Sequence, residues 1–189
     1  METSFKLASS SPLTGLRAGV GVLRESLYGP TMTATPPKNA GVHVPPPFLY
    51  AAAFIIGLLL QRWHPLAITS ANETPRLISA ALFGALYLGF FASAFTEFRK
   101  ARTTLIPNHP ASALVTTGVY RLTRNPMYVS LVALYICAAL ILNTWWPCIV
   151  LPLLILVIDR AVIGREERYL TAAFPDAYPA YVSHVRRWI

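Results

Sequence analysis

The sequence NPMYVSLVALYICAALILNTWWPCIVLPLLILVI occupies residues 125–158 and contains no charged side chain. As one helix rising about 1.5 Å per residue it would extend about 50 Å, whereas a bilayer core is only about 30 Å thick. The stretch must therefore fold back on itself. An Asn-Thr pair at 143–144, followed by two tryptophans and Pro147, is typical of a turn at a membrane interface. We expect two antiparallel crossings, at residues 127–142 and 146–158.

Two further apolar stretches lie upstream. The sequence PFLYAAAFIIGLLL (47–60) is uncharged and is followed by Arg62 and Trp63, which can anchor a crossing at the interface. Residues 44–46 could lengthen it. Residues 77–95 are also uncharged and carry recurring small residues, at which helices can approach closely. The sequence therefore predicts an all-α fold: a polytopic membrane helical bundle of about four transmembrane helices, two of which form a helical hairpin.

The composition supports a membrane location. Hydrophobic residues make up 54% of the chain and charged residues only 13%, whereas about a quarter of a soluble protein is charged. The basic residues, which give a net charge of +8, fall between and after the apolar stretches rather than along one face. We therefore expect no nucleic acid among the partners. Cys137 and Cys148 lie within apolar segments and predict no disulfide, and no metal-ligand spacing is present.

Positively charged residues assign the two sides of the membrane. Five lie between the second and third crossings: Arg99, Lys100, Arg102, Arg121 and Arg124. Five more follow the fourth crossing: Arg160, Arg165, Arg168, Arg186 and Arg187. Because cytoplasmic loops carry the excess of Lys and Arg, both regions are expected on the cytoplasmic side, and four crossings place both termini there. The sequence thus predicts an integral, multi-pass membrane protein.

The two ends of the chain differ from this pattern. Residues 1–43 are rich in Ser, Thr, Gly and Pro and predict a flexible tail, with an organellar transit peptide as an alternative. The membrane-embedded domain then covers residues 44–189. Near the C-terminus, apolar and aromatic residues recur at three- and four-residue steps, which predicts a C-terminal amphipathic helix starting near Pro175. Its face would carry Phe174, Tyr178, Tyr181, Val185 and Trp188. Such a helix rests on the membrane surface or covers the polar segments beside it.

Two polar segments lie at the cytoplasmic ends of the predicted hairpin. The sequence TTGVYRLTRNPMY (116–128) enters the third crossing, and REERY (165–169) follows the fourth. The hairpin brings these segments together, so that cations and carboxylates meet at the membrane surface. A purely structural explanation also exists, in which the glycine permits a turn, the arginines anchor the helices and the glutamates pair with neighbouring arginines. Against it, the Asn125-Pro126 helix start leaves amide donors for an anion, which favours a polar ligand.

The sequences GVYRLTRNPMY (118–128) and EERYL (166–170), with the aromatic, Arg-ended tail, resemble the isoprenylcysteine carboxyl methyltransferase family and related phospholipid methyltransferases. The resemblance begins near His109 and continues to the C-terminus. It implies S-adenosyl-L-methionine (S-adenosylmethionine) as cofactor, bound without a Rossmann fold between the loop before the third crossing and the helix after the fourth. The absence of a G-x-G-x-x-G sequence agrees with this expectation.

The resemblance also implies roles for individual residues. Glu166 or Glu167 would hold the cofactor ammonium or ribose hydroxyls, Arg124 would orient a substrate carboxylate or the cofactor carboxylate, and Tyr128 would position the acceptor. Methyl transfer needs alignment and exclusion of water rather than a nucleophilic residue. The expected catalytic residues are Arg124, Asn125, Tyr128 and Glu167. The expected cofactor-binding residues are His109, Leu114, Val115, Gly118, Val119, Tyr120, Pro126, Glu166 and Glu167.

One position departs from the prenylcysteine enzymes that this chain resembles. Those enzymes have Arg-His-Pro where this chain has Arg124-Asn125-Pro126. A step that uses an imidazole therefore cannot be carried over. The first expectation is methylation of a lipophilic carboxylate, with a prenylated or other lipid acceptor and membrane lipid as partners. The alternatives are a phospholipid N-methyltransferase, or a non-catalytic membrane protein that binds lipid or a partner. The sequence does not indicate an oligomeric state.

Overall fold

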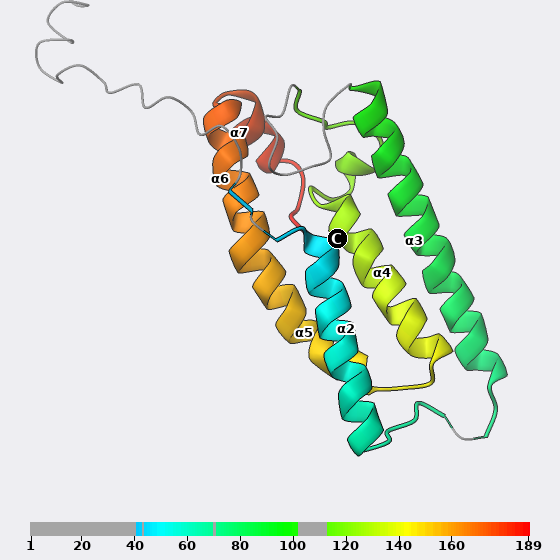
Figure 1. Cartoon of the computed structure of the whole chain (residues 1–189). Coiled ribbons are helices and arrows are strands. Elements are labelled where there is room, and N and C mark those ends of the chain that lie inside the picture. The colour runs from blue at the N-terminus through cyan, green and yellow to red at the C-terminus, as the bar shows by residue number, and fades with distance from the viewer. Residues whose placement is uncertain (1–40, 43, 70, 102–112) are drawn as a thin grey trace, which may run out of the picture. The chain divides into compact units, whose positions relative to one another are not determined.

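The computed structural model describes residues 41–42, 44–69, 71–101 and 113–189, which form helices and connecting segments without a strand (Figure 1). This confirms the predicted all-α class. The predicted tail lies outside the described residues except for 41–42, of which Val42 is buried in the helical bundle. The elements are α2 (Pro46–Trp63), α3 (Thr74–Lys100), η1 (Gly118–Arg121), α4 (Pro126–Ile141), α5 (Trp146–Val157), η2 (Ile158–Ile163), α6 (Gly164–Ala173) and α7 (Ala177–Val182).

Helices α2, α3, α4 and α5 lie side by side along one axis (Figure 1). Helix α3 packs along α4, and α2 packs along α5. Helices α4 and α5 run in opposite directions and are joined at one end, so the predicted fold-back of residues 125–158 is confirmed. Beyond α5, the π-helical turn η2 continues directly into α6, which gives one helix of 28 residues over Trp146–Ala173. The entrance to α4 and the segment α6 therefore meet at the same end of the bundle.

Asn143 shapes the turn of the hairpin. Its φ of 52° lies in the left-handed region, which Asn tolerates better than most residues. Its side chain also binds the connection between α2 and α3: Oδ1 accepts from the backbone N–H groups of Ile68 and Thr69 at 3.1 Å each, and Nδ2 donates to the carbonyl of Thr69 at 2.8 Å. One residue therefore ties both connections at this end of the bundle together.

A buried arginine closes the neighbouring helix end. Arg76, near the start of α3, donates from Nη1 to the carbonyl oxygens of Leu140 and Ile141 in the last turn of α4. The last carbonyls of a helix lack partners within it, and that of Leu140 also accepts from the N–H of Asn143 at 3.1 Å. A cation near a helix C-terminus also interacts favourably with the helix dipole. Arg76 therefore fixes α3 against α4 at the end opposite the polar segments.

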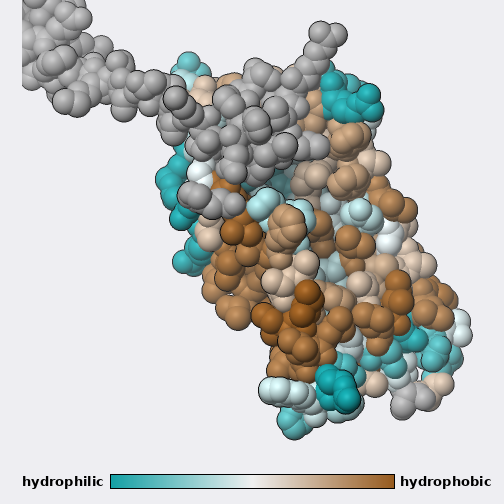
Figure 2. All heavy atoms as spheres, in the orientation of Figure 1, coloured by the Kyte–Doolittle hydropathy of each residue, from teal (hydrophilic) through white to brown (hydrophobic). Residues whose placement is uncertain are grey.

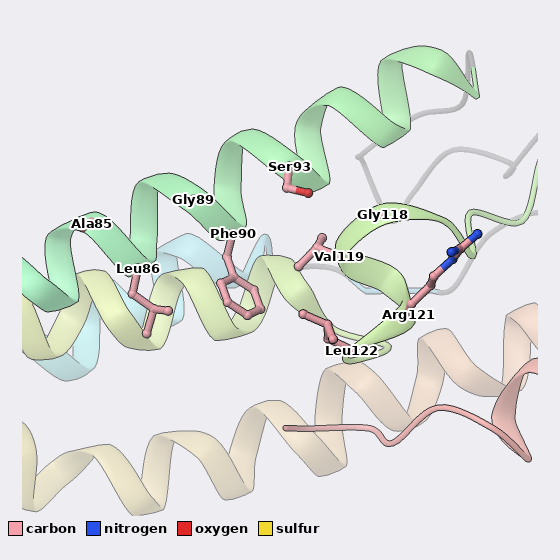
Figure 3. A pocket seen from close by; sticks show the side chains of 9 residues that line it. All are labelled: Ala85, Leu86, Gly89, Phe90, Ser93, Gly118, Val119, Arg121 and Leu122. Atoms are coloured by element: carbon pink, nitrogen blue, oxygen red, sulfur yellow. The ribbon is translucent and has the colours of Figure 1, made fainter.

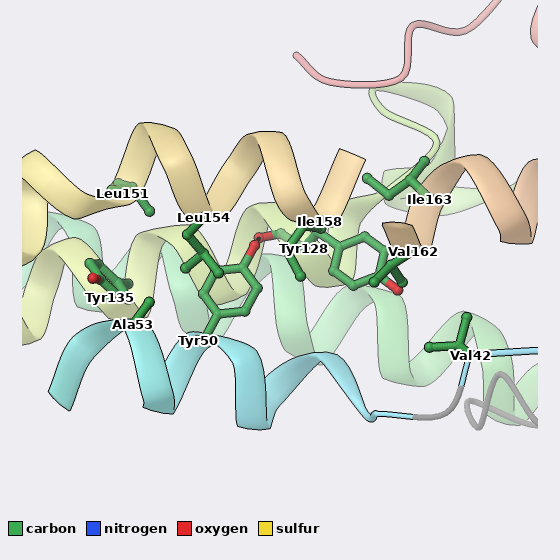
Figure 4. Close-up of a cluster of buried hydrophobic side chains, with 10 residues drawn as sticks. All are labelled: Val42, Tyr50, Ala53, Tyr128, Tyr135, Leu151, Leu154, Ile158, Val162 and Ile163. Atoms are coloured by element: carbon green, nitrogen blue, oxygen red, sulfur yellow. Dashed lines mark hydrogen bonds between the residues drawn. The ribbon is translucent and has the colours of Figure 1, made fainter. Parts of the chain in front are cut away.

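The core lies between α2, α4 and α5 and continues into η2 (Figure 4). Tyr50 of α2 points across it and donates its hydroxyl to the carbonyl of Tyr128 at 3.4 Å. Close contact between α2 and α5 depends on Gly57, because a Cβ there would lie 2.8 Å from the Cα of Pro147. The aromatic and small residues of α2 thus position the N-terminal end of α4, where the polar segment begins.

The surface of the bundle is apolar along its middle, and hydrophilic residues gather toward its two ends on the face shown in Figure 2. Two helices among the described residues are long and apolar enough to cross a membrane, Thr74–Lys100 and Trp146–Ala173. An 18-residue window of the first has a mean hydropathy of 1.9, and one of the second has 2.1. Only 11% of the apolar window of the first is buried, so it is not a soluble core helix. Helix α4 is apolar but shorter. These helices indicate a membrane protein, while the count of four crossings stays a prediction.

The C-terminal segment differs from the prediction. The expected amphipathic helix is confined to α7, which begins at Ala177 and ends at Val182, and residues 186–189 run outside any helix. The prediction that Trp188 shares a helix face with Tyr178 was therefore wrong. The physical reason is that carbonyl groups of the last residues accept hydrogen bonds from the entrance to α4, which competes with helix formation.

Candidate functional site

The polar segment before α4 begins with a tight turn held against the end of α3. Gly118 has a φ of +60°, and a Cβ at this position would lie 2.8 Å from Cγ of Glu97. The Glu97 carboxylate accepts hydrogen bonds from the hydroxyl of Thr117 and from Nζ of Lys100, the latter at 2.8 Å. Both the backbone conformation and the space therefore require glycine, and Glu97 fixes the start of η1.

An alternating chain of charges crosses the site. Arg124, at the entrance to α4, places Nη1 3.1 Å from Oε1 of Glu167 on α6. The same carboxylate accepts two hydrogen bonds from Arg187, from Nε at 3.1 Å and from Nη2. Arg187 also donates from Nη1 to both oxygens of Asp159 in η2, at 3.1 and 3.0 Å. The hairpin ends and the C-terminal segment are thus joined by ion pairs, in the order Arg124, Glu167, Arg187 and Asp159.

Backbone hydrogen bonds hold the C-terminal segment in place. The N–H of Arg124 donates to the carbonyl of Arg186 at 2.9 Å. The carbonyl of Arg187 accepts from the hydroxyl of Thr123 and from Nδ2 of Asn125, both at 2.9 Å. Nε1 of Trp188 donates to Oδ1 of Asp159 at 3.2 Å. Residues 186–188 therefore form a strap that lies across the entrance to α4 and reaches η2, and the end of the chain lies beside the start of α4 (Figure 1).

A second polar pair lies beside the ion pairs. The hydroxyl of Tyr128, in the first turn of α4, donates to Oε1 of Glu166 at 2.8 Å. The Tyr128 side chain is buried, whereas Glu166 is half-buried. Its other carboxylate oxygen makes no hydrogen bond with the residues that the structure describes. This oxygen can therefore accept a hydrogen bond from a ligand.

The environment of the site shifts the pKa values of several of its groups. Hydrogen bonds with Glu167 raise the pKa of Arg187, so its guanidinium is firmly cationic. Burial raises the pKa of the Tyr178 hydroxyl to about 12 and also raises the pKa of Tyr181, while the charge of Arg124 opposes both shifts. Tyr181 donates its hydroxyl to the carbonyl of Tyr120 at 2.6 Å. Helix α7 therefore covers the site with neutral aromatic side chains.

The structure brings together most of the residues expected to carry chemistry. Arg124 and Glu167 meet directly, and Tyr128 meets Glu166. Asn125 instead holds the C-terminal strap. The side chains of Val115, Val119 and Tyr120 pack in a second buried cluster against Ala94 of α3, and Pro126 is buried in the first turn of α4. Leu114 is half-buried in the connection before η1, and His109 lies outside the described residues.

Sequence reasoning missed two residues of the charge network. Asp159 follows the apolar stretch of the fourth predicted crossing, and only the π-helical turn places it toward Arg187. Arg187 itself was counted as one of several cytoplasmic cations. A signal for Asp159 was present, since a lone acid at the end of an apolar helix requires a partner.

The site contains groups that fit a ligand with both positive and negative charges. Nε of Arg124 is buried and has no hydrogen-bond partner among the described residues. Such an orphaned donor suits a carboxylate. The available oxygen of Glu166 suits an ammonium or a hydroxyl. The carboxylate of Glu167, by contrast, is already engaged by two arginines. S-adenosylmethionine carries a carboxylate, an ammonium and ribose hydroxyls, which are complementary to the available groups of Arg124 and Glu166.

Comparisons with known proteins agree with this chemistry. Residues 75–177 match the family model of phospholipid methyltransferases, a range that includes both hairpin ends but stops before the C-terminal strap. An uncharacterized protein of Haemophilus influenzae is 38% identical over 63 residues, which is 33% of this chain and the full length of that protein. No solved structure matches the chain.

Proposed function

This chain belongs to the phospholipid methyltransferase family, and on that premise we propose that it transfers a methyl group from S-adenosylmethionine to a lipid acceptor at the membrane surface. The observation that carries the proposal is the ion pair between Arg124 and Glu167, which joins the two ends of the α4–α5 hairpin beside the Tyr128–Glu166 pair. Nε of Arg124 is buried without a hydrogen-bond partner among the described residues, and one oxygen of the Glu166 carboxylate is available to a ligand.

The proposed cofactor site uses Arg124 and Glu166. Nε of Arg124 would bind the carboxylate of S-adenosylmethionine, and Glu166 would accept a hydrogen bond from its ammonium or ribose. The cofactor supplies an electrophilic methyl group on a sulfonium. The remaining task for the protein is to align the acceptor with that methyl group and to exclude water. Tyr178 and Tyr181 of α7 serve the second purpose.

The acceptor can be a carboxylate or an amine, and one acid of the site favours the amine. Asp159 and Glu167 balance the guanidiniums of Arg124 and Arg187, which leaves Glu166 as the remaining acid of the network. Burial raises the pKa of Glu166 to about 7, so this carboxyl can exchange protons near neutral pH. An amine must lose a proton to present its lone pair, and a carboxyl with such a pKa can accept that proton. Phospholipid N-methylation is therefore the second candidate beside O-methylation of a lipophilic carboxylate.

Binding and turnover measurements test the proposal. The full chain in detergent should bind S-adenosylhomocysteine, and Arg124→Ala and Glu166→Gln should weaken binding. Incubation with radiolabelled S-adenosylmethionine and a lipid extract should label a lipid, and treatment with base distinguishes a labile methyl ester from a stable methylamine. Absence of binding by the wild-type chain would remove the proposed function and leave a lipid- or partner-binding membrane protein.

The proposed orientation follows from the placement of charge. We propose that residues 44–189 form the membrane-embedded domain, that it crosses four times, and that both termini face the cytoplasm. The basic residues beside the site support this orientation, as cytoplasmic ends of crossings carry the excess of Lys and Arg. The cofactor then enters from the cytoplasm and the lipid acceptor from the bilayer.

A further inference from the structure

An open groove lies between one face of α3 and the turn that leads into α4. Its volume is about 570 Å³. The lining residues are Ala85, Leu86, Gly89, Phe90, Ser93, Gly118, Val119, Arg121 and Leu122. Figure 3 shows Leu86 and Phe90 of α3 between the helix and the turn, with Val119 and Leu122 beside them and Arg121 at one end of the groove. The groove is therefore apolar along its length and cationic at one end.

The apolar part of the groove is shaped for a hydrocarbon chain. A Cβ at Gly89 would meet no atom within 4 Å, so the floor of the groove is open at this point. Leu122 is 64% exposed and Leu86 is 40% exposed, although both are large and apolar. Only 11% of the apolar window of α3 is buried, and these exposed apolar side chains suit a lipid environment.

The charged end of the groove selects an anionic headgroup. Arg121 is exposed, and Arg99 and Lys100 lie at the same end of α3. The carboxylate of Glu97 beside these cations is already bound by Lys100 and Thr117, so the end of α3 next to the groove carries a net positive charge. An apolar groove that ends at cations complements an amphiphile with a phosphate headgroup.

The groove is also linked to the proposed active site. Its wall is the turn 118–122, and the next residues are the buried Thr123 and Arg124 of the ion pair. Val119 lines the groove and also belongs to the buried cluster with Tyr120. A lipid bound in the groove therefore has its headgroup at the same end of the bundle as the charge network.

We propose that this groove binds one acyl chain of a membrane phospholipid, with the lipid phosphate on Arg121. The inference rests on the proposed function and specifies where its acceptor lipid docks. Gly89 sets the depth of the groove, and Leu86, Phe90 and Leu122 form its walls. The exposed arginine pairs with the phosphate, and its positive charge favours a phospholipid of net negative charge over a zwitterionic one.

Lipid binding can be measured without the cofactor. Phosphatidylglycerol with a nitroxide on its acyl chain, added to phosphatidylcholine nanodiscs that contain the full chain, should show a motionally restricted spectral component. Gly89→Trp, whose Cβ has open space and whose indole should occupy the groove, should remove that component, and Gly89→Leu should reduce it. Leu88→Trp is the matched control, because Leu88 is 62% exposed and lies outside the groove.

The headgroup contact has its own test. Arg121→Gln should lower the preference for phosphatidylglycerol over phosphatidylcholine about fivefold, the effect of one arginine near an anionic lipid surface. Arg168→Gln, which removes an exposed charge from α6, should leave the preference unchanged. An equal loss of lipid preference in both variants would show a general charge effect and overturn the proposed groove site. Binding of inorganic phosphate to Arg121 in the absence of lipid would have the same meaning.

The outcomes separate this inference from the proposed function. If the wild-type chain immobilises the lipid but binds no S-adenosylhomocysteine, the groove proposal stands and the enzymatic proposal fails. If the Gly89→Trp variant methylates lipid at the wild-type rate and still shows the restricted spectral component, the groove proposal fails and the enzymatic proposal stands. A Gly89→Trp chain that changes from dimer to monomer by sedimentation would identify the occupant as a second copy, which also overturns the lipid proposal.

Discussion

Nη1 of Arg124 lies 3.1 Å from Oε1 of Glu167, although one residue precedes α4 and the other follows the π-helical turn after α5. The two side chains are only 12% and 18% exposed. The pair therefore closes the hairpin at its polar end, as Asn143 closes it at the other. Such a contact acts on the fold and on the site at once, and its two effects can be separated.

The first prediction concerns this pair. Glu167→Gln should lower the free energy of unfolding by about 3 kcal/mol, because it leaves the partly buried guanidinium of Arg124 without its carboxylate. Arg124→Gln should cost less, because Glu167 keeps its ion pair with Arg187. The double variant should lose less than the sum of the two, since no orphaned charge remains from the pair. Unfolding in detergent, followed by circular dichroism, measures all three values. Methyl transfer should be abolished in every variant while helical content is retained.

Arg168→Gln provides the control for this cycle. Arg168 is exposed on the same helix as Glu167 and should be neutral in both measurements. If the losses of unfolding free energy in the Arg124 and Glu167 variants are additive, and these variants keep full activity, the two residues are not functionally coupled.

The second prediction concerns the turn at Gly118. Gly118→Ala should destabilise the protein by roughly 2 kcal/mol through the left-handed φ alone, and the clash with Glu97 adds to this cost. Adding Glu97→Ala should relieve the clash but not the backbone strain, so stability should recover in part. Gly89→Ala is the matched control, because its new Cβ meets nothing within 4 Å. Equal stability of the two alanine variants, measured by thermal unfolding, would show that the turn does not require glycine.

The fold-back of the hairpin could be predicted because two strong constraints acted together. An uncharged stretch too long for one crossing had to turn, and Asn143 was the polar break at its centre. The meeting of Arg124 and Glu167 then followed from the topology alone. Their exact pairing, and the capping of α4 by Arg76, depend on side-chain directions that periodicity does not contain.

The C-terminal strap could not be predicted in the same way. The spacing of Tyr178, Tyr181 and Trp188 fits a helix face, and local pattern has no information on competing tertiary hydrogen bonds. The amide of Arg124 and the side chain of Asn125 bind carbonyls of the strap and hold it outside the helix. Tertiary contacts of this kind commonly override local propensity in the last residues of a chain.

The third prediction concerns the strap itself. Arg187→Gln removes the ion pairs with Glu167 and Asp159, so residues 186–188 should detach from the entrance to α4. Hydrogen exchange at the amide of Arg124, which donates to the carbonyl of Arg186, should then become at least tenfold faster. Arg186→Gln is the control, because it removes the same charge from an exposed side chain and keeps the carbonyl.

The pH dependence of this contact follows from the pKa of Arg187. Because hydrogen bonds with Glu167 raise that pKa, the stabilisation is fully present below the usual pKa of a guanidinium and is lost only as the pH rises through the still higher pKa in the folded protein. Exchange at Arg124, corrected for its intrinsic rate, should therefore show no alkaline release of the strap between about pH 7 and pH 10. A release in this window would identify a different controlling group.

The final prediction concerns the orientation of the bundle in the membrane. In a background where Cys137 and Cys148 are replaced by alanine, Trp145→Cys should react with an impermeant maleimide added outside cells, because Trp145 is 44% exposed at the hairpin turn. Arg165→Cys, exposed on α6, should react only after the membrane is made permeable. This opposite labelling follows from the excess of cations at the α6 end, since moving such an end across the bilayer is unfavourable. Labelling of both positions from one side would mean that α5 does not cross the membrane, and the proposed entry of cofactor from the cytoplasm and lipid from the bilayer would then fail with it.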